Sequence, residues 1–280
     1  MKKKRKFLRK KKKKFSPIPL LFCAAAILAI DALFFLWLHF STESTEPDIS
    51  IELPTVQTAP TIESTAPLET ESTAPLPTET IPPETGPQIL PYFAQMAEQN
   101  PDMVGWIKID NTKLDYPIMF TPDNEEKYLH KNFEGNFSVG GLPFISASCC
   151  LGPRSDNLIV YGHNMANGTM FNTLLKYEQI NYWREHPIIH VSSLYEEKEY
   201  EIIAAFYDRV YQKTEKTFKF YQFIDADSEE AYDEAISYYK KHALYDTGVD
   251  STYGDKLITL VTCAYHVDNG RFVVVAKEKA

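Results

Sequence analysis

Two short segments of the sequence end a predicted strand on a side chain that can do chemistry. The segment DNLIVYGHNM places His163 just after the apolar run 158–161, and LITLVTC places Cys263 after the apolar run 257–261. A buried strand that delivers a polar side chain to its exposed end holds it rigidly beside a cleft. Each signal alone is weak, because a histidine in a turn is more often structural and an isolated cysteine is commonly a small buried hydrophobe.

Arg271 strengthens the pattern because it opens the apolar strand that follows Cys263, after the polar connection AYHVDNG. If the two strands pair antiparallel, Cys263 and Arg271 lie near one another at the same edge of a sheet. A guanidinium in that place can stabilise the oxyanion that forms when a thiolate attacks a carbonyl. These residues therefore predict nucleophilic acyl transfer. The plainer alternative for Arg271 is a solvated turn residue.

The other histidines and cysteines have weaker claims. His266 lies three residues from Cys263, but it belongs to the same tight connection and is poorly placed to point at the thiol. No motif surrounds the remaining candidates His130, His186, His190 and His242. Cys149 and Cys150 are adjacent, so a strained disulfide between them is not expected. Cysteine spacing predicts neither a zinc site nor a disulfide framework, so we expect no metal.

The body of the chain, residues 89–280, consists of short strand-like pieces broken by turns. We expect a short helix in PYFAQMAEQNPD and strands in VGWIKI, KLDYPIMF, GNFSVGGLPFIS, NLIVYGHN, KLITLVTC and RFVVVAK. One longer helix follows Asp227, which with Glu230 suggests a capping box. Its predicted apolar face contains Tyr232, Ala235, Ile236, Tyr239 and Ala243. Many short strands with Gly and Pro between them predict a mainly β fold, a barrel or a sandwich.

Charge divides the chain unevenly. Lys2 to Lys14 carry eleven of the 29 Lys and Arg residues, which leaves 18 basic residues against 38 acidic ones in the remainder. Nucleic-acid binding depends on clustered basic side chains that release counterions, so a body this acidic argues against a nucleic-acid partner. We interpret residues 1–14 as a basic tail on the cytoplasmic side of a membrane.

Residues 15–40 predict a transmembrane helix. Roughly twenty-three mostly apolar residues run from Ile18 with Asp31 as the single charge, which is enough to cross a hydrocarbon core of about 30 Å. The basic block before them should stay inside the cell, which places the chain after Ser41 outside it. A cleaved signal peptide is the alternative, but its apolar region would be only about 7 to 15 residues long.

Residues 41–88 are rich in Thr, Pro, Glu and Ser and almost free of aromatic side chains. Such a segment cannot bury enough apolar surface to offset the entropy lost on ordering. We expect a disordered, extended linker that holds the folded domain, residues 89–280, away from the bilayer.

The motifs YGHNM, TLVTC and NGRFVVV together resemble the sortase family, over about Pro101 to Lys277. The stretch MVGWIKIDNTKLDYPIMFTPDNEEKYLHKNFEGNFSVGG, with a helix before the cysteine strand, is most similar to the class B branch. The resemblance implies an eight-stranded sortase-like β-barrel with a few helices. It also implies Cys263 as nucleophile, His163 as general acid and base, and Arg271 as the oxyanion partner. Val261 stands where a serine is familiar in that branch.

The resemblance further implies a cysteine transpeptidase at the cell membrane that works without a cofactor. Its partners would be secreted proteins with a C-terminal sorting signal, which is cleaved after threonine through a thioester. The acceptor would be an amino group of a peptidoglycan precursor or of a pilin subunit. Two alternatives are a papain-like cell-wall cysteine peptidase, disfavoured because His163 precedes the strand-borne Cys263, and a stalked binding module without catalysis.

Overall fold

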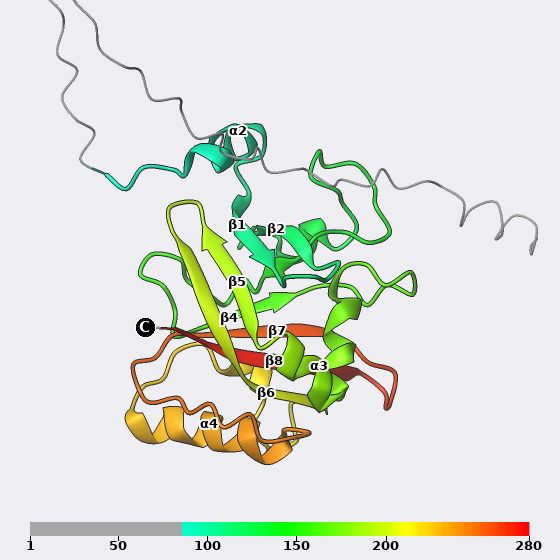
Figure 1. Ribbon diagram of the computed structural model, residues 1–280, viewed down its shortest axis with the longest axis vertical. Helices are drawn as coiled ribbons and strands as arrows, with labels where there is room; N and C mark the ends of the chain where they lie inside the picture. Colours follow the sequence, from blue (N-terminus) through cyan, green and yellow to red (C-terminus); the bar gives the residue numbers. More distant parts are fainter. Residues whose placement is uncertain (1–85, 280) are drawn as a thin grey trace, which may run out of the picture. The chain divides into compact units, whose positions relative to one another are not determined.

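The computed structural model describes residues 86–279. The predicted basic tail, the predicted transmembrane helix and nearly all of the predicted linker lie outside these residues. Between residues 86 and 279, none of the helices is both long and apolar enough to span a bilayer. The strands of this region form a closed barrel in the order β1-β2-β3-β4-β7-β8-β6-β5 (Figure 1). The prediction of a mainly β fold is therefore confirmed.

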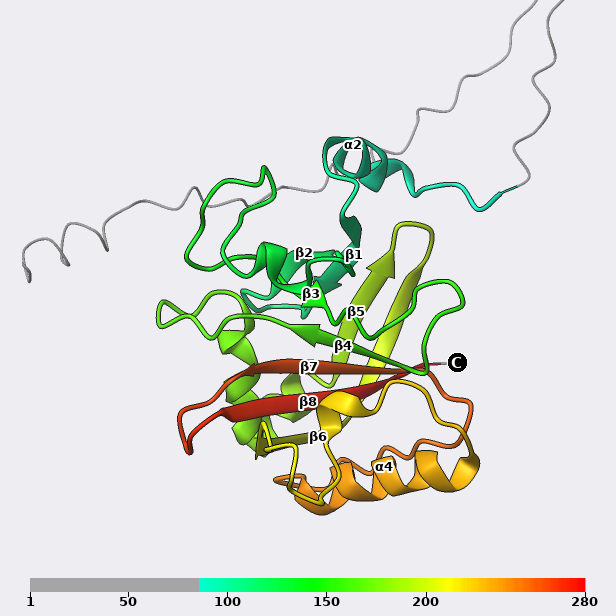
Figure 2. The same ribbon diagram turned by 180° about the vertical axis from the view of Figure 1, so that it is seen from behind.

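Most neighbouring strands of the barrel are antiparallel, but β2 pairs with β3 and β4 pairs with β7 in parallel. The strands within residues 86–279 are β1 (Met103–Lys108), β2 (Asp115–Met119), β3 (Phe144–Ile145), β4 (Asn157–Tyr161), β5 (Ile188–Ser193), β6 (Glu197–Arg209), β7 (Leu257–Cys263) and β8 (Gly270–Glu278). Figure 2 shows β4, β7 and β8 side by side. Two strands separated by about a hundred residues in the sequence are thereby joined directly.

Short helices lie between the strands. The α-helices of the described region are α2 (Pro91–Gln99), α3 (Ile180–Glu185) and α4 (Glu229–His242), and the 3-10 helices are η1 (Glu125–Tyr128), η2 (Phe171–Glu178) and η3 (Phe220–Gln222). The helix expected in PYFAQMAEQNPD is present as α2. Figure 1 shows α4 along the outside of the barrel, where it contacts β6.

The start of α4 differs from the prediction by one residue. Ser228, not Asp227, is the N-cap, because its backbone is extended and its Oγ accepts a hydrogen bond from the N–H of Ala231. The predicted apolar face is otherwise confirmed, since four of its side chains are buried, namely Tyr232, Ala235, Ile236 and Tyr239. Ala243 ends the helix as its C-cap.

Strand β8 is buried on both faces. All residues from 272 to 276, the run FVVVA, are buried, which is the pattern of a strand covered on both sides. Strands β7 and β6 flank it, and η2 packs against both β7 and β8. Cys263 and Arg271 lie at one end of this pair of buried strands, β7 and β8.

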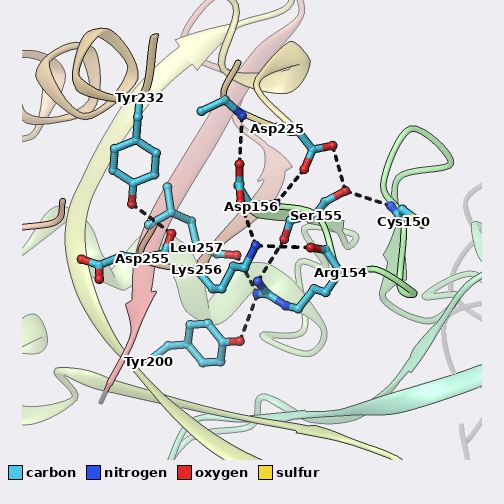
Figure 3. A network of polar contacts seen from close by, with 11 residues as sticks. Cys150, Arg154, Ser155, Asp156, Tyr200, Asp225, Tyr232, Asp255, Lys256 and Leu257 are labelled. Atoms are coloured by element: carbon cyan, nitrogen blue, oxygen red, sulfur yellow. Dashed lines mark hydrogen bonds and ion pairs between the residues drawn. The ribbon is translucent and has the colours of Figure 1, made fainter. Parts of the chain in front are cut away.

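At the other end of the barrel a polar network joins the starts of β4 and β7 (Figure 3). Lys256 Nζ donates to Asp156 Oδ1 at 2.7 Å, and Asp156 Oδ2 accepts from the N–H of Ala226, shortly before α4, at 3.0 Å. Arg154 Nη2 donates to the carbonyl oxygen of Leu257 at 2.9 Å. Three segments far apart in the sequence are therefore held together by hydrogen bonds to charged groups, which are stronger than neutral ones.

Replacing Asp156 should destabilise the fold in a pH-dependent way. Burial raises the pKa of Asp156, but hydrogen bonds from Lys256 and Ala226 outweigh burial and hold the pKa below its ordinary value. Its stabilising effect is therefore present above the unfolded-state pKa and is lost as the pH falls through the lower folded-state pKa. We expect Asp156→Asn to lower the free energy of unfolding by about 1 to 2 kcal/mol at neutral pH, since the pair is partly exposed.

Urea denaturation of the full chain at neutral and acidic pH would measure this effect. The matched control is Glu199→Gln, which removes an exposed ion pair with Lys279 and should cause no measurable change. Equal effects of the two substitutions, or a difference that persists undiminished at strongly acidic pH, would contradict the role given to Asp156.

Candidate active site

Cys263 and Arg271 lie directly opposite one another on β7 and β8. Residues opposite each other on antiparallel strands point their side chains to the same face of the sheet. The antiparallel pairing that we expected from the short connection is thus present. The Cys263 thiol is free and half-buried. Arg271 Nη1 donates to the carbonyl oxygen of Gly270 at 2.9 Å, which, within residues 86–279, occupies one of the five N–H donors of the guanidinium.

His163 reaches the same end of the barrel on the neighbouring strand. The last pair between the parallel strands β4 and β7 joins Tyr161 to Val261, and the N–H of Gly162 continues the ladder to the carbonyl oxygen of Val261 at 3.1 Å. His163 and Cys263 each lie two residues beyond this pair. The structure therefore brings all three predicted residues to one end of three adjacent strands.

Two asparagines tie the His163 segment to the cysteine. Asn164 Nδ2 donates to the carbonyl oxygen of Cys263 at 2.9 Å. Asn164 Oδ1 in turn accepts from Nδ2 of Asn172, on η2, at 2.7 Å. Sequence reasoning assigned no role to either asparagine. A signal was present in Asn164, which directly follows His163, but the partner on η2 depends on the fold.

The imidazole of His163 is oriented by a backbone carbonyl. Its Nε2 lies 2.9 Å from the carbonyl oxygen of Leu129, in the connection between β2 and β3. A carbonyl oxygen only accepts hydrogen bonds, so Nε2 carries the proton and Nδ1 is the ring atom free to take one up. Burial lowers the pKa of His163; the Leu129 bond opposes this, and the charge of His130 lowers the pKa further. Burial and the neighbouring histidine thus both favour the neutral imidazole.

The connection that supplies Leu129 is shaped by a glycine. Gly141 has φ +58°, and a Cβ at this position would lie 2.3 Å from the Leu129 carbonyl oxygen and 2.4 Å from that of Tyr128. Leu142 also donates its N–H to the Tyr128 carbonyl at 3.0 Å. Only glycine allows this close approach without moving the carbonyl that holds His163.

Asp208 on β6 lies at the same end of the barrel as His163, Cys263 and Arg271. It lies opposite Arg271 across β6 and β8 and is only 6% exposed. Its Oδ2 accepts from the hydroxyl group of Tyr238, on α4, at 2.9 Å. No motif around Asp208 pointed to this position, because it depends on how β6 pairs with β8. The contact anchors α4 beside the strand pair that carries Arg271.

Two of the other histidines lie near these strands. His266 is exposed, and its ring lies 4.7 Å from that of Tyr207 on β6. His130, around which we found no motif, stacks on His163 with ring centroids 5.1 Å apart. The contact could not be read from the sequence because 33 residues separate the two rings. Cys149 is a buried free thiol and Cys150 an exposed one, as expected.

Comparison with known proteins agrees with this architecture. A family model described as the sortase domain matches residues 107–279. Sortase B of Staphylococcus aureus is 30% identical over 191 residues, which cover 68% of this chain and 75% of that protein. Sortase B of Listeria monocytogenes is 33% identical over 182 residues, covering 64% and 70%.

Solved structures show the same relationship. The S. aureus sortase B–substrate complex has a TM-score of 0.61 at 27% identity, covering 68% of this chain and 86% of that one. Sortase B of Bacillus anthracis in complex with AAEK1 has a TM-score of 0.59 at 28% identity, covering 68% and 85%. The fold and its relatives thus define a cysteine transpeptidase. The chain belongs to the sortase family, and its relatives are class B sortases.

Substituting Gly141 should impair the site through the Leu129 carbonyl. We expect Gly141→Ala to lower cysteine-dependent peptide cleavage at least tenfold, because small misplacements of reacting groups cost large factors in rate. The matched control is Gly135→Ala, in the same connection and also at positive φ (+80°) but with open space around the added methyl group. Circular dichroism would verify folding. Equal activity of the two variants would contradict this account of the glycine.

Removing the Asn164 side chain should loosen the link between the His163 segment and Cys263. We expect Asn164→Ala to lower kcat roughly tenfold to a hundredfold with little change in KM, because the lost bond orients the reacting groups instead of binding substrate. The control is Asn167→Ala, an exposed residue of the same segment. Steady-state kinetics at several substrate concentrations would separate the two parameters. A rise in KM at unchanged kcat would overturn the assignment.

Proposed function

We propose that this chain is a membrane-anchored cysteine transpeptidase that cleaves a sorting signal after its threonine and joins the protein to an amino group of peptidoglycan. Cys263 would attack the threonine carbonyl, so that an S–C bond forms and the C–N bond breaks. The incoming amine would then attack the thioester, which forms the new C–N bond and regenerates the thiol. The observation that carries the proposal is the pairing of Cys263 with Arg271 beside the strand that leads to His163.

The state of His163 suits both steps. A neutral imidazole with its proton on Nε2 can accept the thiol proton at Nδ1 and then give it to the leaving amine. The same atom can next take a proton from the incoming amino group and return one to the sulfur. Arg271 would stabilise the oxyanion formed in each step. No electrons are exchanged, so the reaction requires no redox cofactor.

Exposed apolar side chains near these residues support a peptide substrate. Tyr265 is 85% exposed and Val267 47% exposed, both shortly after Cys263. Phe137 is 78% exposed and projects from the connection that contacts His163 through His130. Apolar side chains in such a place could pack against the residues that flank the threonine.

The relatives support both substrates of the proposed reaction. S. aureus sortase B has been solved with substrate, and a sortase B has been solved with triglycine. Triglycine presents a free α-amino group on an unhindered residue, which is the chemistry that an acceptor amine requires. By this analogy we infer that the acceptor of the present enzyme is a small peptide amine of the cell wall.

The proposed location follows from the N-terminal sequence. We infer that residues 1–14 stay in the cytoplasm, residues 15–40 span the membrane, and residues 41–88 form a linker to the catalytic domain at 89–280. An enzyme that joins exported proteins to peptidoglycan must act outside the membrane, and the positive-inside rule favours that orientation. The acidic composition of the chain beyond residue 14 agrees with the expected absence of a nucleic-acid partner.

A peptide panel would test the reaction. The full chain in detergent would be incubated with fluorescent LPxTG, PPxTG and NPxTN peptides, with and without triglycine, beside Cys263→Ala. We expect cleavage after threonine, capture of triglycine as a new amide, and loss of both in Cys263→Ala. Arg271→Ala should lower kcat about a hundredfold or more, because oxyanion donors commonly contribute that much. Cleavage that survives in Cys263→Ala, or no cleavage by folded protein, would refute the proposal.

A further inference from the structure

His130 and its neighbour Leu129 hold two different parts of the His163 ring. The rings of His130 and His163 are stacked, with centroids 5.1 Å apart and planes inclined by 28°. The carbonyl oxygen of Leu129 accepts from Nε2 at 2.9 Å. The stacked ring therefore restrains the tilt of the imidazole plane, and the hydrogen bond restrains rotation of the imidazole within that plane.

His130 is itself held from the other side. Its carbonyl oxygen accepts from the N–H of Ser138 at 3.1 Å, which fixes the backbone of the connection across the turn. The ring of Phe137 lies near that of His130, with centroids 6.2 Å apart and planes inclined by 30°. Phe137, His130 and His163 thus form a series of three rings that leads from an exposed position to the candidate active site.

We propose that His130 is a positioning residue for His163: its stacked ring orients the His163 imidazole and opposes a second positive charge beside it. This inference deepens the proposed function and rests on it for its effect on rate. Two stacked imidazolium ions repel each other, so protonation of His130 disfavours protonation of His163. The stack thereby favours the form of His163 that can accept the thiol proton.

The surrounding charges are compatible with this role. On the neighbouring strands, Cys263 ends β7 and Arg271 opens β8. Glu125 of η1 acts electrostatically on Tyr161, two residues before His163. Burial and the charge of His130 both lower the pKa of His163. His130 is exposed, so it can be replaced without disturbing the core.

Two substitutions separate the charge of His130 from its ring. His130→Phe keeps a flat ring on His163 and removes the titratable group, whereas His130→Ala removes both. The control His190→Phe makes the same exchange on β5, at a histidine that lies 3.2 Å from Asp110. Proton titration of His163 would be followed by NMR of the full chain labelled with ¹³C-histidine, with the resonance assigned from His163→Gln.

We expect the pKa of His163 to rise in His130→Phe and to stay unchanged in His190→Phe. The rate of peptide cleavage at pH 6 relative to pH 8 should fall roughly twofold to threefold in His130→Phe, because more His163 is protonated at the lower pH. His130→Ala should lose activity at both pH values as well, by roughly tenfold, because the ring that orients His163 is gone.

The NMR titration and the kinetic assay test different parts of the proposal. The NMR midpoint of His163 requires no substrate, so it tests the positioning role even if the chain cleaves none of the peptides. A midpoint that is the same in wild type and His130→Phe would overturn the electrostatic part of the proposal. Full activity of His130→Ala in an enzyme that depends on Cys263 would overturn the orienting part and leave the proposed function intact.

Discussion

The candidate site depends on the backbone pairing of β7 with β4 on one side and β8 on the other. The side chains of a strand alternate between its faces, so a shift of one residue in either register would turn Cys263 to the opposite face. The buried run 272–276 of β8 and the buried strand β7 oppose such a shift, because it would exchange interior and exterior side chains. Packing of the barrel wall therefore determines where the thiol points.

The two ends of the barrel are built differently. At the end where β4 and β7 begin, Asp156, Lys256 and Arg154 join the chain segments through charged hydrogen bonds. At the end that carries Cys263, the contacts come from connections between strands, through a carbonyl oxygen, an asparagine side chain and a stacked ring. Such connections can adapt to a substrate while the strands keep Cys263 in place, which is the usual division between scaffold and site.

Electrostatics of the site follow from the same contacts. The Leu129 carbonyl selects which nitrogen of His163 carries the proton, and burial together with His130 disfavours a second proton. The cationic residue Arg271 lies opposite Cys263 in the strand register. An imidazole that is neutral before the reaction can act first as a base and then as an acid. A group whose charge is fixed cannot do both.

Local patterns were sufficient for several of the elements and for the proximity of Cys263 to Arg271. Helix α2, the apolar face of α4 and the apolar strands β4, β7 and β8 follow from periodicity. The pairing of Cys263 with Arg271 follows from one short connection. The cap of α4 was misplaced by one residue, because Asp227 and Ser228 both favour that position and only the backbone conformation distinguishes them. Strands β5 and β6 were not identified, and in β6 the charged first half hides the buried second half.

The sequence by itself thus determined the three chemical groups, the strands that end on them and the family. Only the tertiary structure decided which other residues meet them. Leu129 and His130 reach His163 across more than thirty residues, Asn172 reaches Asn164 through η2, and Asp208 reaches the same end of the barrel through β6. Periodicity and spacing report on neighbours along the chain, whereas these contacts depend on barrel closure, which joins strands that no local pattern relates.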